Sequence, residues 1–157
     1  GYAGDDSVLV STSGLPIVYS VYNTARLVRE DLCRFPFVQS GLTGDTANED
    51  DKHQIFFYPK LKNMLCHQFP LRAIVIPVVA DGRSQLKKAG PITALKALAP
   101  STLLHAPGDS ADLLKKMRKL VETVPCCSLF CGSDRQQTAS IIRSLCLGDL
   151  RHDCDAQ

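Results

Sequence analysis

The run from Leu71 to Val79 constrains the fold more than any other part of this sequence. It reads Leu-Arg-Ala-Ile-Val-Ile-Pro-Val-Val, and Asp81-Gly82 follows it. A strand with one face in water alternates apolar and polar residues, whereas a strand covered on both faces is nearly continuous in apolar and β-branched side chains. We therefore expect a strand buried on both faces, as in the sheets of α/β proteins.

The segments that follow predict the elements that cover such a strand. Three of them have apolar residues at helical spacing and predict helices: residues 91–104, 109–124 and 134–147. Residues 126–131 form a short apolar run after Pro125 and predict a last strand. This order of elements predicts an α/β or α+β fold with a mixed sheet.

The first part of the chain predicts mainly strands. Three short apolar segments carry this prediction: residues 7–11, 15–20 and 54–58, of which the first two form a hairpin around Ser13-Gly14. Residues 24–35 have apolar groups at helical spacing behind Thr24, a capping residue, so we expect a helix that stops before Pro36. The polar, acidic residues 41–52 predict a loop.

Composition bounds the class of protein. The chain has 157 residues, 45% of them hydrophobic, which is typical of one globular domain. We place that domain at residues 1–148 and a loose polar tail at 149–157. The formal net charge of +2 gives no electrostatic basis for binding nucleic acid or an anionic membrane. No apolar stretch is long enough to span a membrane, and the acidic start is unlike a signal peptide.

The cysteines predict a compartment. The chain has 7 of them, an odd number, and none forms a Cys-x-x-Cys pair with a second pair of metal ligands. An odd count without a signal peptide indicates reduced thiols and a cytoplasmic location. The histidines also lack ligand spacing, and we expect all four at surface or boundary positions: His53, His67, His105 and His152.

Gly4-Asp5-Asp6 is the most distinctive chemical feature. It stands directly before a predicted strand, and an acid at a strand end holds Mg²⁺ in many nucleotide enzymes. Gly-Asp-Asp is also common in turns, so these residues alone leave both readings open. Lys52 and Arg72 begin or precede predicted strands and are candidates for pairing with phosphate, with ordinary boundary charges as the alternative.

Taken together, these segments resemble the region that follows the P-loop helix in HPr-kinase-like proteins. The resemblance covers residues 1–147 and rests on the order of segments and on the paired aspartates. The matching segments are Gly1-Tyr2-Ala3-Gly4-Asp5-Asp6-Ser7-Val8-Leu9-Val10, Glu49-Asp50-Asp51-Lys52, and residues 70–77, 91–98 and 113–129.

The resemblance implies a P-loop NTPase-like fold, similar to the C-terminal domain of HPr serine kinase/phosphorylase and more distantly to phosphoenolpyruvate carboxykinase. It implies a mixed sheet with flanking helices and an ATP- and Mg²⁺-dependent kinase acting on a hydroxyl of a protein or peptide. Asp5 or Asp6 would hold Mg²⁺ or polarise the acceptor hydroxyl, and Lys52 and Arg72 would neutralise phosphate charge. A homo-oligomer is compatible with it.

The sequence lacks the most specific motif of that family, the phosphate-binding loop. It contains no GxxxxGK[ST] loop, and so lacks the strand and helix that carry the phosphate-binding backbone. Three interpretations follow: a truncated piece of a longer kinase, which we favour, one half of a split enzyme, or a degenerate homologue. On the first, the chain is inactive alone. The alternative function is a non-catalytic interaction module in a peptide-modification system.

Overall fold

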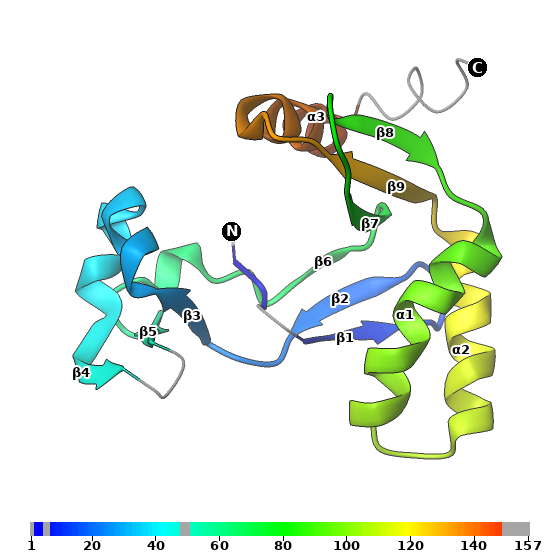
Figure 1. Cartoon of the computed structure of the whole chain (residues 1–157). Helices are drawn as coiled ribbons and strands as arrows, with labels where there is room; N and C mark the ends of the chain where they lie inside the picture. The colour runs from blue at the N-terminus through cyan, green and yellow to red at the C-terminus, as the bar shows by residue number, and fades with distance from the viewer. Residues whose placement is uncertain (1, 5–6, 48–50, 149–157) are drawn as a thin grey trace. The chain divides into compact units, whose positions relative to one another are not determined.

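The computed structural model describes residues 2–4, 7–47 and 51–148. The chain forms two compact units, Gly1–Leu71 and Arg72–Gln157, and each has its own sheets (Figure 1). The predicted domain over residues 1–148 thus contains two such units. The protein is mixed α/β, as the sequence predicts. Within these described ranges, no helix combines the length and the apolar character that crossing a bilayer requires.

The first unit contains the predicted hairpin, which the structure confirms. β1 (Val8–Ser11) and β2 (Ile17–Ser20) are antiparallel, and Gly14 has a φ of 77° in their connection. Glycine adopts this backbone at little cost because it has no Cβ. A strand that the sequence does not predict, β6 (Gln68–Pro70), pairs with the other edge of β2.

The predicted helix over residues 24–35 is wrong, because its first part is a strand. This strand, β3 (Thr24–Val28), is antiparallel to β5 (Lys52–Phe56) along its whole length. Ala25 and Leu27 pack against the core of the unit, two residues apart as strand geometry requires. Pairing with β5 therefore decides what the apolar spacing of a short segment leaves ambiguous.

Two short 3₁₀ helices, Arg29–Arg34 and Pro36–Gly41, lead from β3 to β4 (Leu42–Ala47). The prediction of a loop over residues 41–52 is therefore wrong in its first half. β4 pairs with β5 through an irregular register. Its polar and glycine-containing sequence has little intrinsic strand preference, so the neighbouring strand supplies the reason for its extended backbone.

The core of the first unit lies under this second sheet. Its four buried side chains are those of Val38, Ile55, Phe57 and Leu61. The ring of Tyr2 stacks on that of Phe57 with 4.3 Å between centroids, and the Tyr2 hydroxyl donates to the Thr24 carbonyl at 2.8 Å. The Tyr2 N–H donates to the carbonyl of Met64, in the short 3₁₀ helix Lys62–Met64, at 2.6 Å. These contacts fix the described N-terminal residues against the core.

The second unit contains one three-stranded sheet in the order β7-β9-β8. β7 (Ile74–Val79) is parallel to β9 (Cys126–Cys131), and β8 (Gln85–Lys88) is antiparallel to β9. The predicted strand over residues 126–131 and the predicted mixed sheet are confirmed. β8 is a strand that the sequence analysis missed.

The three predicted helices are also confirmed, with bounds that differ by no more than one residue at either end: α1 (Pro91–His105), α2 (Ser110–Thr123) and α3 (Arg135–Leu147). The Asp109 carboxylate caps α2 by accepting from the Asp112 N–H at 3.2 Å. Asp134 caps α3 in the same way, accepting from Gln136 N–H at 2.9 Å, and α3 ends at Gly148 in the left-handed conformation. α1 and α2 connect β8 to β9 and pack against each other (Figure 1).

β7 lies at an edge of the described sheet, and the prediction that both its faces are buried is wrong. Ile74 packs against the α1 and α2 core, but Val75 is 38% exposed and Val79 is 96% exposed. The N–H groups of Ile74 and Ala80 donate to carbonyls on the β9 side. Because successive backbone groups alternate in direction, the nitrogen of Pro77 faces the open edge, where its missing N–H breaks no bond.

A hydrogen-bonded cluster joins the loop after β7 to the start of α3. The buried Ser84 hydroxyl bonds to the Thr138 hydroxyl at 2.7 Å and accepts from the Gly132 N–H at 3.0 Å. The Ser84 N–H donates to the Gln137 side-chain oxygen at 2.9 Å. Gly132 approaches Gly82 so closely that a Cβ at Gly132 would overlap the Gly82 carbonyl oxygen.

We expect Gly132→Ala to lower the free energy of unfolding by about 3 kcal/mol, because the new methyl group must displace backbone rather than a flexible side chain. Gly90→Ala is the matched control, since nothing lies within 4 Å of a Cβ there. Its cost should stay under about 1 kcal/mol. Urea unfolding followed by circular dichroism measures both. Equal effects from the two substitutions would contradict the close approach.

Two of the cysteines of β9, Cys126 and Cys127, should be chemically protected. Burial raises the pKa of the Cys126 thiol because the thiolate loses its hydration, and Cys127 is also buried. Cys33 and Cys146 are exposed. At neutral pH we expect brief alkylation of the native chain to modify Cys33 and Cys146, and the two buried thiols only after unfolding. Peptide mass spectrometry resolves the sites, and rapid native labelling of Cys126 would contradict this prediction.

Candidate functional site

A hollow of about 350 Å³ lies in the first unit, where β2 ends. Six residues line it: Ser20, Val21, Tyr22, Asn23, Leu65 and His67. They come from two segments: the end of β2 with its connection to β3, and the chain that enters β6. Its volume is at the lower end of the range for small-molecule sites in proteins.

Backbone hydrogen bonds hold the two walls of the hollow in place. The Ser20 N–H donates to the His67 carbonyl at 2.9 Å and so joins one wall to the other. The Phe57 N–H donates to the Asn23 carbonyl at 2.9 Å. The Ser20 hydroxyl donates to the Tyr22 carbonyl at 3.0 Å. The wall backbone is therefore fixed before any ligand binds.

The side chains of these walls are available to a ligand. Tyr22 is 57% exposed, and Asn23 and His67 are also exposed. Within the described ranges, no side-chain hydrogen bond is formed by Tyr22, Asn23 or His67. None of the six lining residues carries a fixed charge. The hollow can thus offer hydrogen bonds and an aromatic surface, but little compensation for a phosphate group.

The predicted aspartates, Asp5 and Asp6, lie outside the described residues. Described residues before and after these aspartates in the sequence pair with residues of the hollow. Tyr2 forms an isolated parallel bridge with Leu65, and Val8 is paired with Ser20. Leu65 and Ser20 both line the hollow. Two described residues, Tyr2 and Val8, therefore pair with residues that line the hollow.

Neither of the two predicted phosphate-binding cations is among the residues that line the hollow. Lys52 is half-buried and lies opposite Val28, at the far end of β3 from Asn23. β3 is 5 residues long, which corresponds to about 16 Å of extended chain. Arg72 is exposed and is the first residue of the second unit. Neither cation contributes to the described site.

The sequence does not predict the residues of the hollow, because none of them forms a motif. Ser20 and Asn23 frame a short connection between strands, and His67 precedes β6, which was itself not predicted. The available signal was the change from apolar residues to Ser20, Tyr22 and Asn23 after a predicted strand. Only the pairing of β2 with β6 places His67 beside them.

One histidine contradicts its predicted boundary position. His53 lies in β5, is 7% exposed, and has a buried Nε2 atom without a hydrogen-bond partner among the described residues. Among those same residues, no three His, Cys, Asp or Glu side chains are grouped closely enough to hold a metal ion. The structure therefore supports no metal centre around His53 in the part of the chain that it describes.

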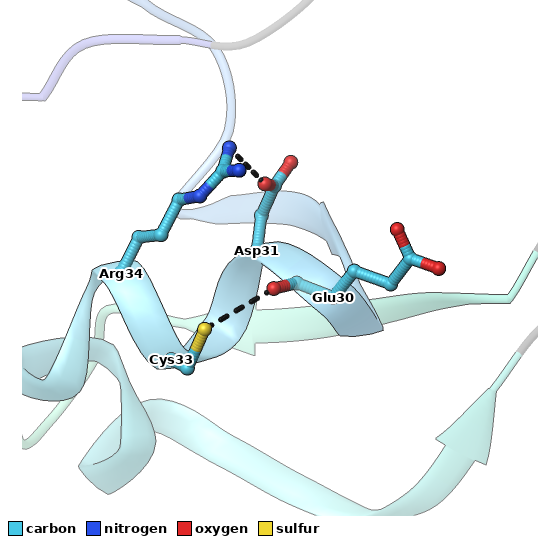
Figure 2. A network of polar contacts seen from close by, with 4 residues as sticks. All are labelled: Glu30, Asp31, Cys33 and Arg34. Carbon is cyan, nitrogen blue, oxygen red and sulfur yellow. Dashed lines mark hydrogen bonds and ion pairs between the residues drawn. The ribbon is translucent and has the colours of Figure 1, made fainter.

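A second polar group lies in the first 3₁₀ helix (Figure 2). Arg34 forms an ion pair with Asp31 at 2.6 Å, and the Cys33 thiol donates to the Glu30 carbonyl at 3.3 Å. Figure 2 shows that both contacts stay within one turn and that the Glu30 carboxylate points away. Exposed ion pairs of this kind contribute under about 1 kcal/mol. This network stabilises its own turn and leaves the hollow as the stronger candidate.

Comparison with known proteins adds no relative to this description. No protein-family model matches the chain, and no curated protein or solved structure is significantly similar to it.

We expect His53→Leu to raise the free energy of unfolding by about 1 kcal/mol, because it removes a buried nitrogen without a described partner and keeps a similar volume. His105→Leu is the control, since His105 is exposed at the end of α1. It should change stability by less than about 0.5 kcal/mol. Chemical unfolding of both variants is the measurement. Destabilisation by His53→Leu would mean that Nε2 is bonded in solution.

Proposed function

We propose that this chain is the C-terminal part of an ATP-dependent kinase of the HPr-kinase-like group, acting on a hydroxyl of a protein or peptide. The observation that carries the proposal is the position of the hollow. The described chain on both sides of Asp5 and Asp6 runs beside it, through the Tyr2–Leu65 and Val8–Ser20 pairs. The proposal assigns the nucleotide or the acceptor to the hollow and the Mg²⁺ ion to Asp5 and Asp6.

The chemistry of the residues fits these roles. Carboxylate oxygens are the ligands that Mg²⁺ prefers, so Asp5 and Asp6 are suited to hold the ion that accompanies ATP or to accept a proton from the acceptor hydroxyl. When bound, Mg²⁺ neutralises the developing charge on the transferred phosphoryl group. The sequence has no phosphate-binding loop, so Lys52 and Arg72 are the remaining candidates for contacting phosphate, once an upstream segment is present.

The second unit supports a P-loop NTPase-like fold as part of this proposal. Its parallel pair, β7 and β9, is connected through β8, α1 and α2, and α3 follows β9. Parallel strands joined through helices are typical of nucleotide-binding α/β folds. All described cysteines are free thiols, which agrees with a cytoplasmic location.

An interaction module is the second candidate, and one observation favours it. The outer face of β7 exposes Val75 and almost all of Val79 in the second unit. Exposed apolar groups that are contiguous on a surface are characteristic of protein-binding sites. Such a module would require neither nucleotide nor Mg²⁺, so nucleotide binding separates the two candidates.

We expect Mg-ATP to bind more tightly to the chain extended upstream in its gene to include a phosphate-binding loop than to the 157-residue chain, which has no such loop to hold the triphosphate. In the extended form, Asp5→Asn with Asp6→Asn should weaken Mg²⁺-dependent binding at least about tenfold. Titration calorimetry with and without Mg²⁺ is the measurement.

Asp81→Asn is the matched control, because Asp81 is an exposed carboxylate in the second unit. It should leave binding unchanged. If the upstream sequence contains no phosphate-binding loop and neither form binds Mg-ATP, the kinase proposal fails and the interaction module replaces it.

A further inference from the structure

We propose that the hollow between Ser20 and His67 binds the adenine ring of a nucleotide. This inference rests on the proposed function for its biological meaning, but its chemistry is carried by the six lining residues alone. It assigns the hollow to the base and leaves the phosphates to other parts of the site.

The surface of the hollow suits a flat, uncharged ring. Tyr22 and His67 supply two aromatic side chains from opposite walls, and Val21 and Leu65 supply apolar contact. Bases stack on aromatic side chains because every base has a π-face. A hollow of about 350 Å³ has room for a purine.

Asn23 gives the hollow its preference among bases. A carboxamide offers one donor and one acceptor side by side, which match the N7 acceptor and N6 donor of adenine. The Asn23 backbone is held by its hydrogen bond from Phe57 at 2.9 Å, so the side chain projects from a fixed position. Its amide has no partner within the described residues, so binding a base breaks no internal contact there.

The absence of charge among the lining residues argues for a base over a phosphate. None of the six lining residues is a lysine or an arginine, and Lys52 lies at the far end of β3 from Asn23. A phosphate group placed in the hollow would lose hydration without gaining an ion pair. A neutral heteroaromatic ring loses much less favourable hydration than a phosphate group when it enters the hollow.

The walls are also organised in advance. The bond from Ser20 N–H to the His67 carbonyl joins the backbones of the two walls, and the Ser20 hydroxyl holds the Tyr22 backbone. Binding then orders only side chains, which reduces its entropic cost. Adenosine should therefore bind this chain without any phosphate-binding loop.

The test uses the 157-residue chain and adenosine, which carries no phosphate. Chemical-shift titration should show weak, saturable binding of adenosine and at least about tenfold weaker binding after Tyr22→Ala. Asn23→Leu should reduce the preference for adenosine over cytidine by a similar factor, about tenfold. Phe37→Ala is the control, because Phe37 is an exposed aromatic residue outside the hollow, and it should change neither quantity.

Other outcomes separate the two proposals. If adenosine does not bind, or binds equally well to Tyr22→Ala and Asn23→Leu, the adenine site is refuted even when the extended chain binds Mg-ATP. Displacement of adenosine by inorganic tripolyphosphate would also refute it, since the hollow would then accept phosphate. Adenosine binding that depends on Tyr22 supports the adenine site even if Asp5→Asn with Asp6→Asn has no effect on Mg-ATP.

Discussion

The pairing of β2 with two partners at once is the constraint on which the candidate site depends. β1 occupies one edge of β2, and β6, from the end of the first unit, occupies the other. The Ser20 N–H to His67 carbonyl bond closes this pairing and places two segments beside each other that are distant in sequence. Because β2 ends there, the next residues leave the sheet, and Tyr22 is turned toward solvent at the rim of the hollow.

In the second unit, β9 has the corresponding role. It lies between β7 and β8, so both its edges are paired and Cys127 and Leu129 are buried. The same insertion leaves β7 at an edge, where Pro77 has no N–H to present to another strand. Natural edge strands often carry such features, which limit unwanted pairing. Gly132, which directly follows β9, lies against the loop after β7. The close packing there requires that residue 132 has no side chain.

The candidate site shows where prediction from sequence reached its limit. Paired acids before a predicted strand can be recognised in the sequence, so Asp5 and Asp6 could be proposed without a structure. The hollow could not, because its walls come from residues 20–23 and 65–67 and neither part contains a motif. Lys52 was proposed from its place at a strand end, but strand pairing puts it opposite Val28, away from the hollow. His53 was expected near the surface, and the pairing of β5 with two neighbours buries it.

By itself, the sequence determined the elements whose stability is local. The caps and apolar stripes of α2 and α3 and the hairpin of β1 and β2 are readable because each depends on neighbours in the chain. The apolar runs of β7 and β9 are readable from their composition alone. Only the tertiary structure decided β3 instead of a helix, the existence of β4, β6 and β8, and the open face of β7. Short strands have no internal hydrogen bonds, so their extended backbone exists only where a partner strand satisfies it. The hollow forms where those strand pairings bring its two walls together, so the tertiary structure determines it as well.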